Sequence, residues 1–262
     1  QCPSFTVPNE PIRPIADIAV DAASFDLDWI IFTDHSYDMD ATEWQQAQEE
    51  CEQAETDTGL LVMCGEELSV DEFDGDYIDE GGSSLHSDTG HYLCYGISQF
   101  IANTGDLPFN FYPDDPDSQT AINTVNGQGG VGFIAHPYEY AWDWNNWDVN
   151  GYTGIEVWNS GWNSWPGNEE DEAFNRWDAL LRAGLASGRH IVGIGNSDAH
   201  PRDRLYPTPD ETYEPSVWTY LLLPSLTPES IVDAYRDGHS VFTNGPLLVF
   251  KVGQQEIGET VN

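Results

Sequence analysis

Short apolar runs that stop at a histidine or an acidic residue recur along this chain of 262 residues. The clearest spans residues 191–200, where the run Ile-Val-Gly-Ile-Gly leads into Asn-Ser-Asp-Ala-His and predicts a buried strand that ends before Asp198. Because side chains two positions apart on a strand point the same way, we expect Asp198 and His200 to face one spot. Such a pair is typical of metal ligands or of an acid–base pair, and a capped turn with a surface histidine is the structural alternative.

Strands and helices alternate along most of the chain. Apolar runs predict strands at residues 27–33, 60–69, 91–97, 131–135, 155–158, 217–223, 240–243 and 247–252, in addition to the strand before Asp198. Helical spacing predicts helices at residues 15–25, 41–58, 119–126, 169–186 and 227–236. This alternation favours an α/β barrel, whose chemistry lies at the rim formed by the carboxyl ends of its strands.

Residues that suit metal coordination fall at this rim. A lone histidine is usually structural, but several ligand-type residues at successive strand ends indicate a metal site. Imidazoles and carboxylates together suit zinc, manganese or iron, and this set is large enough for more than one ion. The candidate ligands are His35, Glu67, His91, His136, Asp198 and His200.

The strands at residues 60–69 and 91–97 have no helix between them, so an antiparallel hairpin is the economical connection. Pairing Glu67 with His91 in this hairpin also places Cys64 opposite Cys94. A disulfide at that place depends on strand geometry. Two states stay open for the cysteines, disulfide pairs or buried reduced thiols, and they concern Cys2, Cys51, Cys64 and Cys94.

Acidic residues dominate the charge, since 46 Asp and Glu stand against 8 Lys and Arg, for a formal net charge of −38. This charge repels nucleic acid and anionic membrane surfaces, and it suits a salt-rich environment in which ions screen the self-repulsion. No run approaches the roughly 20 apolar residues of a membrane span. Because the chain starts at Gln1, we expect a mature secreted or trimmed form at an extracellular or cell-surface location.

At these strand ends the chain resembles the polymerase and histidinol phosphatase (PHP) superfamily of metallohydrolases. The segments that follow the family pattern are Thr33-Asp-His35, Gly65-Glu-Glu67, Gly90-His91, Ala135-His-Pro137, Gly154-Ile-Glu-Val-Trp-Asn159 and Asn196-Ser-Asp-Ala-His200. The later stretches at residues 226–238 and 241–246 resemble the branch that includes the carbaryl hydrolase. The resemblance covers nearly the whole chain, and the order and spacing of the segments make it specific.

The resemblance implies a distorted seven-stranded β/α barrel over residues 1–243, followed by a short C-terminal β-segment over residues 244–262 that could begin a further region. It implies one to three divalent ions, of zinc, manganese or iron, and hydrolysis by a metal-bound hydroxide. The ligand roles that it implies are a bridging Glu67, a first metal completed by His91 and His136, a second held by Asp198, and a third held by His35 and His200.

One departure from the family concerns the N-terminal His-x-His pair and the Asp that follows it. Those positions fall near Pro3, Phe5 and Glu10, so neither histidine is present. Glu10 remains available to the third metal, whereas the second metal keeps only the carboxylates of Glu67 and Asp198. Two carboxylates alone predict weak binding of that ion.

Two functions fit this sequence. The first is hydrolysis of a phosphoester or a related ester by Glu67 and Asp198, with a small anionic or ester substrate held by Arg202 or Arg204. The second is a secreted structural or self-assembling protein on a barrel that has lost part of its site. A homo-oligomer or larger assembly would then form through a tryptophan-rich region that comprises Trp142, Trp144, Trp147, Trp158, Trp162 and Trp165.

Overall fold

The computed structural model describes residues 14–36, 39–71, 89–101, 117–138, 143–159, 169–198 and 217–259. Its helices are α1 (Ile15–Ser24), α2 (Ala41–Thr58), α3 (Ser118–Gly127), α4 (Glu169–Ser187) and α5 (Pro228–Arg236). Its strands are β1 (Trp29–Phe32), β2 (Leu61–Cys64), β3 (Glu66–Asp71), β4 (Thr89–Tyr95), β5 (Val131–Ile134), β6 (Gly154–Asn159), β7 (Val192–Asn196), β8 (Trp218–Leu221) and β9 (Ser240–Thr243). The predicted α/β class is confirmed.

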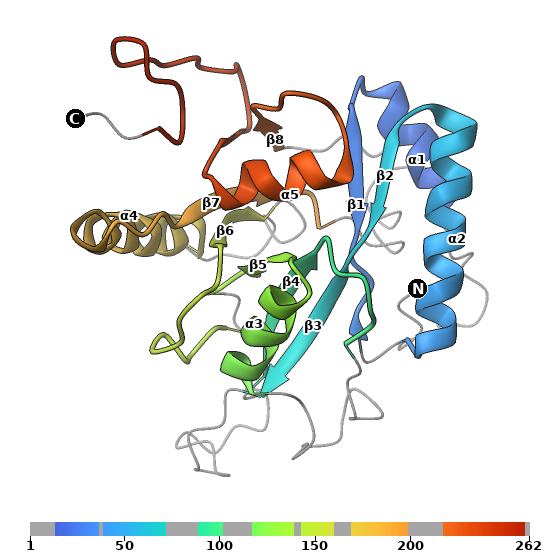
Figure 1. Cartoon of the computed structure of the whole chain (residues 1–262), viewed down its shortest axis with the longest axis horizontal. Helices are drawn as coiled ribbons and strands as arrows, with labels where there is room; N and C mark the ends of the chain where they lie inside the picture. The colour runs from blue at the N-terminus through green and yellow to red at the C-terminus, as the bar shows by residue number, and fades with distance from the viewer. Residues whose placement is uncertain are drawn as a thin grey trace.

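The central sheet contains five strands in the order β3-β4-β5-β6-β7, and β1-β2 and β8-β9 form two-stranded sheets (Figure 1). The β3-β4 and β4-β5 pairs are antiparallel, whereas β5-β6 and β6-β7 are parallel. Within the described ranges these sheets do not close into a ring, so the seven-stranded barrel stays a prediction. The parallel strands nevertheless point their carboxyl ends to one edge, as a metal site at that edge requires.

A glycine divides the predicted strand at residues 60–69 into β2 and β3. The Gly65 N–H donates to the Phe32 carbonyl at 2.7 Å, and the next link is from the Glu67 N–H to the Asp34 carbonyl at 3.0 Å. A Cβ at Gly65 would lie 2.5 Å from the Cys94 carbonyl oxygen, so only glycine lets the backbone approach this closely. The chain after β1 therefore runs beside both β2 and β3 and joins the two sheets.

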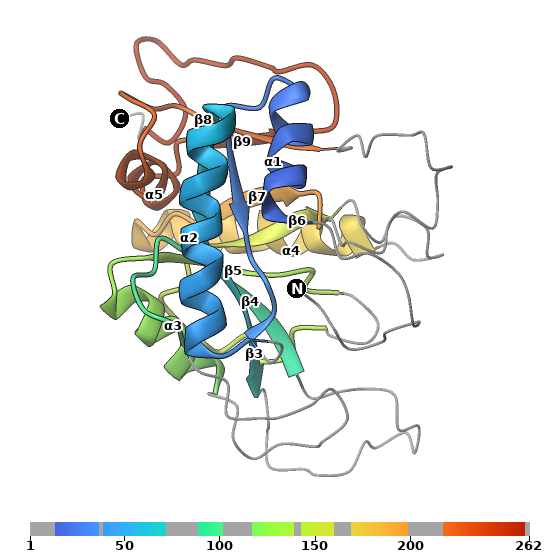
Figure 2. The same cartoon turned by 90° about the vertical axis from the view of Figure 1, so that its right-hand side faces the viewer.

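Helices α1 and α2 lie side by side against β1 and β2 (Figures 1 and 2). The α2 helix begins at Asp40 with a capping box formed with Glu43 and ends at Gly59, whose φ of 75° needs a glycine. The predicted inward face of α2 is confirmed, since its buried residues are Trp44, Ala47, Cys51 and Ala54. None of the helices in the described ranges has the length and apolar character needed to cross a membrane.

Strands β4 and β5 are buried on both faces. Tyr92 and Ile134 belong to one apolar cluster and Leu93 and Phe133 to another, because neighbouring residues of a strand point to opposite faces. Tyr235 of α5 covers the second cluster, with its ring centroid 5.0 Å from that of Phe133. The sheet is thus sandwiched between apolar layers, as parallel α/β sheets are.

The predicted hairpin of β3 and β4 is confirmed, but the predicted register is wrong. Glu67 pairs with Leu93 rather than with His91, and His91 pairs with Ser69. The strand break at Gly65 moves the start of β3 to Glu66, which the spacing alone does not reveal. The shift is an even number of residues, so Glu67 and His91 still share a face of the sheet.

The predicted opposition of Cys64 and Cys94 is also wrong. Cys64 ends β2 and pairs with Phe32, whereas Cys94 pairs with Glu66. Both are free thiols, as is Cys51, so the reduced state is the one observed among the described cysteines. The hydrogen bond with Cys64 and burial raise the pKa of the Cys51 thiol. Cys2 lies outside the described residues.

The strand predicted at residues 247–252 is wrong. This segment is irregular, with a single antiparallel bridge between Val252 and Gln255. Leu248, Val249 and Phe250 are 79%, 72% and 72% exposed. An apolar run becomes a strand only when a neighbouring strand pairs with it, and none does so in the described part of the chain. The division at residue 243 stays a prediction.

Close packing between β5 and β4 gives a stability prediction. A Cβ added at Gly132 would lie 2.2 Å from the ring of Tyr92, which is fully buried. Gly132→Ala should therefore lower the free energy of unfolding by about 1–3 kcal/mol through overpacking, as measured by denaturant titration. Gly127→Ala, at the end of α3 with nothing within 4 Å of the added carbon, is the control. A loss in the control as large as that in Gly132→Ala would contradict the steric explanation.

Candidate metal centre

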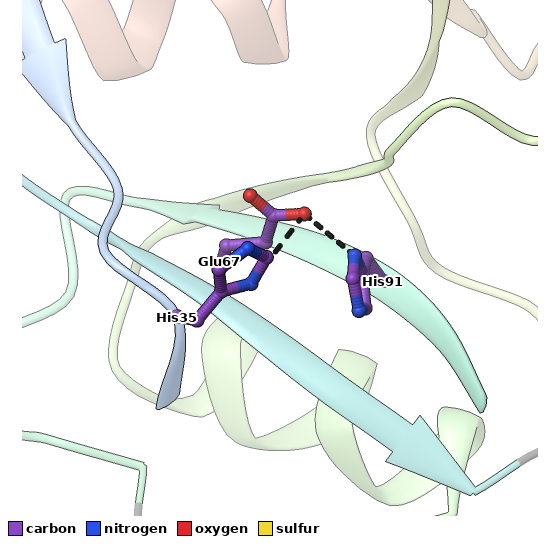
Figure 3. A group of neighbouring side chains, drawn as sticks. All are labelled: His35, Glu67 and His91. Atoms are coloured by element: carbon purple, nitrogen blue, oxygen red, sulfur yellow. Dashed lines mark ion pairs between the residues drawn. The ribbon is translucent and has the colours of Figure 1, made fainter. Parts of the chain in front are cut away.

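Three histidines surround one carboxylate oxygen at the edge of the central sheet. The Glu67 Oε1 atom lies 2.7 Å from His91 Nδ1, 3.2 Å from His136 Nε2 and 3.9 Å from His35 Nδ1. The His91 Nδ1 and His136 Nε2 atoms are 3.1 Å apart. Figure 3 shows His35 and His91 on either side of the Glu67 carboxylate. Four of the predicted metal ligands are therefore brought together.

Each of these side chains comes from a different element. His35 follows β1 and forms a parallel bridge with Glu67 of β3. His91 lies on β4, two residues from the Leu93 that pairs with Glu67. His136 lies two residues beyond the end of β5 and has a φ of 22°, a backbone conformation that non-glycine residues rarely adopt. The strained backbone turns the His136 ring toward Glu67, as functional sites often require.

The electrostatics keep Glu67 ionised in a buried position. Glu67, His35 and His91 are 6%, 7% and 3% exposed. Burial by itself would raise the pKa of Glu67, but the charges of His35 and His91 and the hydrogen bonds from His136 and His91 outweigh it. They hold the pKa of this carboxyl well below its usual range.

The donor set and its spacing fit a divalent ion. Ligand atoms about 2.0–2.1 Å from a tetrahedral ion lie about 3.3 Å from one another. The separations of Glu67 Oε1, His91 Nδ1 and His136 Nε2 are 2.7, 3.1 and 3.2 Å. His35, Glu67 and His91 also form a group in which all three ligand atoms lie within 4.8 Å of one another. Imidazole nitrogen with carboxylate oxygen suits zinc, manganese or iron.

Asp198 follows β7 at the same edge, with a φ of 47°. Its Oδ2 atom accepts a hydrogen bond from Asn159 Nδ2 at 3.0 Å, and Asn159 Nδ2 also donates to Glu156 Oε2 at 3.1 Å. The group formed by His35, Glu67 and His91 includes neither Asp198 nor His136. The structure thus places Asp198 in a polar network beside the histidines.

Glu156 of β6 is the centre of this network and was missed by the sequence analysis as a site residue. Its Oε2 accepts from the His136 backbone N–H at 2.8 Å, and its Oε1 accepts from Asn196 Nδ2 at 2.8 Å. Burial raises the pKa of Glu156 to about 7. The charge of His136 acts to lower this pKa, and the negative charge of Asp198 acts to raise it. A charged residue inside an otherwise apolar strand was the signal that could have revealed it.

Several predicted residues lie outside the described ranges, so their roles stay predictions. They are the ligands Glu10 and His200, the anion-binding Arg202 and Arg204, and the tryptophans Trp142, Trp162 and Trp165. Of the other tryptophans, Trp144 is buried against Tyr92, with ring centroids 6.2 Å apart, and so serves the core. Assembly through the tryptophan-rich region stays a prediction.

A solved structure of similar fold supports the observed architecture. The chain is similar to a two-domain protein from Bacteroides vulgatus that contains a predicted PHP-like metal-dependent phosphoesterase, with 17% identity and a TM-score of 0.51. The match covers 88% of this chain and 59% of the neighbour. At this identity the likeness concerns the fold alone.

Looser similarities are to a protein assigned as a metal-dependent phosphoesterase from Bifidobacterium adolescentis and to an amidohydrolase from Chromobacterium violaceum. The identity is 15% in both cases, and the TM-scores are 0.39 and 0.43. The matches cover 68% and 71% of this chain, and 80% and 81% of those chains. No family model and no curated protein matches the sequence, so the carbaryl-hydrolase branch stays a prediction.

The neighbour of Glu67 on β3 gives a prediction about pH. Burial raises the pKa of Glu66 from its ordinary 4.5 to about 8, although Oε2 accepts a hydrogen bond from the Ile101 N–H. Between these two values the folded chain keeps a proton that the unfolded chain has released, so stability falls as the pH rises. Relative to Glu66→Gln, the wild type should lose up to about 1.4 kcal/mol per pH unit in this window.

The measurement is the free energy of unfolding of both proteins at several pH values between 4 and 9. Glu49→Gln, at an exposed position of α2, controls for the removal of one negative charge from an acidic chain. A constant difference between wild type and Glu66→Gln across this range would contradict the assigned shift.

Proposed function

We propose that this chain is a metal-dependent hydrolase of the PHP type that cleaves phosphoester or related ester bonds. The observation that carries the proposal is the convergence of His91, His136 and His35 on one buried oxygen of Glu67, at distances of 2.7, 3.2 and 3.9 Å. The three nearest donors, from Glu67, His91 and His136, match in number the protein ligands of a catalytic zinc site. The predicted closed barrel, and a location in salt-rich surroundings outside the cell, belong to the same proposal.

The residues would divide the work as follows. Glu67, His91, His136 and His35 would hold a divalent ion, which supplies Lewis acidity and lowers the pKa of a water molecule. Glu156 fixes the His136 backbone through its 2.8 Å hydrogen bond and so sets the direction of that ring. Asp198, held by Asn159 at 3.0 Å, stands ready to accept a proton or to contribute to a second ion.

Metal binding is the direct test. Metal analysis and thermal unfolding of the purified protein should show at least one divalent ion per chain and a rise in Tm with added zinc or manganese. Glu67→Gln should weaken binding by more than the roughly 10- to 100-fold that loss of an outer hydrogen bond costs. Glu66→Gln is the matched control, because the adjacent side chain points to the other face of β3 and should leave metal binding intact.

The outcomes separate cleanly. Loss of metal from Glu67→Gln, with metal retained in Glu66→Gln, supports the proposed centre. Equal metal content in wild type and Glu67→Gln, or none in a folded wild-type protein, would overturn it. Hydrolysis of p-nitrophenyl phosphate should require the bound metal. The activity should therefore be present in Glu66→Gln and absent from Glu67→Gln and from chelator-treated wild type. Turnover that persists after the metal is removed would contradict a metal-dependent reaction.

A further inference from the structure

Arg176 of α4 contacts two aromatic side chains, the ring face of Trp147 and the hydroxyl of Tyr138. Its guanidinium carbon lies 4.2 Å from the ring centroid of Trp147, and its Nε donates a hydrogen bond to the Tyr138 hydroxyl at 2.8 Å. The Tyr138 and Trp147 rings are themselves stacked, with centroids 6.1 Å apart and planes 23° apart. All three side chains are half-buried. The plane and direction of the guanidinium are therefore fixed before any ligand binds.

Arg176 is one of two cations in the described ranges, with Arg189, that have no carboxylate partner there. With 46 acidic residues against 8 basic ones, a cation is expected to pair with a carboxylate. Arg182 pairs with Asp178, Arg236 with Asp233, and Lys251 with Glu256.

Arg189, the remaining cation of the described ranges, lies over Tyr152 and donates to a backbone carbonyl. Arg176 has no carboxylate partner in the described part of the chain, and Nε is its only nitrogen with a hydrogen bond there. Its two terminal nitrogens thus present N–H donors that no carboxylate of the described residues occupies.

The Arg176 guanidinium is hydrogen-bonded to the segment that follows His136 of the candidate metal centre. Tyr138 is two residues beyond His136, whose Nε2 is 3.2 Å from Glu67, and two residues span at most about 7 Å of chain. The segment is tied back by the Trp144 N–H, which donates to the Pro137 carbonyl at 3.0 Å. Arg176 is therefore joined, through the Tyr138 hydroxyl, to the segment that directly follows the candidate ligand His136.

We propose that Arg176, Tyr138 and Trp147 form an oxyanion-binding subsite beside the candidate metal centre, which takes a phosphate or carboxylate group of the substrate. A planar guanidinium with two terminal amino groups binds either oxyanion in a bidentate manner. Tyr138 and Trp147 fix the guanidinium, so less side-chain freedom is lost on binding. The assignment as a substrate subsite rests on the proposed hydrolase function, whereas the binding of the oxyanion does not.

The test is titration of chelator-treated and metal-loaded full-length protein with inorganic phosphate, followed by calorimetry and tryptophan fluorescence at constant ionic strength. In both forms Arg176→Gln should weaken phosphate binding at least about tenfold, because it removes hydrogen bonds to a charged group. Tyr138→Phe should weaken it less, through loss of the anchor at Nε. Arg182→Gln, six residues along α4 in an exposed ion pair, should stay within about twofold of wild type.

The results identify the class of oxyanion and separate the subsite from the hydrolase proposal. A parallel titration with acetate distinguishes the two ligands, since tighter phosphate binding assigns a phosphate group and tighter acetate binding a carboxylate. No phosphate or acetate binding, or equal losses in Arg176→Gln and Arg182→Gln, would overturn the subsite. Binding that needs the metal and ignores Arg176 would overturn the subsite and leave the hydrolase proposal standing. Binding that depends on Arg176 in a protein that takes up no metal would support the subsite and overturn the hydrolase proposal.

Discussion

A buried carboxylate with three histidines around it is the constraint on which the rest of this structure depends. Burying an ionised Glu67 costs free energy unless opposite charges and hydrogen bonds compensate. The compensation comes from His35, His91 and His136, which lie far apart in the sequence and on separate elements. This compensation requires that the chain after β1, the β3-β4 hairpin and the end of β5 be aligned so that the three rings reach Glu67. Gly65 permits that meeting, because it lets the backbone approach the Cys94 carbonyl.

A second polar layer supports this cluster from the parallel strands. Glu156 joins the His136 backbone to Asn196 and, through Asn159, to Asp198. One carboxylate thereby fixes the ends of β5, β6 and β7 relative to each other. The two site residues with positive φ, His136 and Asp198, both follow strands of this layer. The strain in their backbones is stabilised by a network that is itself satisfied by hydrogen bonds.

The sequence predicts best what local chemistry determines. The limits of α2 follow from Asp40 and Gly59, and most of the candidate ligands follow from the residues at which apolar runs stop. The register of β3 and β4 is not local, because Gly65 can lie within a strand or end one, and the carbonyl that decides between these is distant in sequence. Glu156 carried a signal, a charge in an apolar strand. Arg176 carried none, since its partners at residues 138 and 147 meet it only in the folded chain.

The charge of the chain gives the positive groups near the centre a particular importance. A net charge of −38 repels an anionic ester at long range, and salt confines that repulsion to roughly 8 Å at physiological ionic strength. Within that distance, binding must come from local positive charge. The Glu67 cluster suits a divalent ion, and Arg176 lacks a carboxylate partner in the described residues. Among the other described cations, Arg182, Arg236 and Lys251 are neutralised by carboxylates, and Arg189 lies over Tyr152. The Glu67 cluster and Arg176 are therefore places where an acidic protein of this kind can attract an anion.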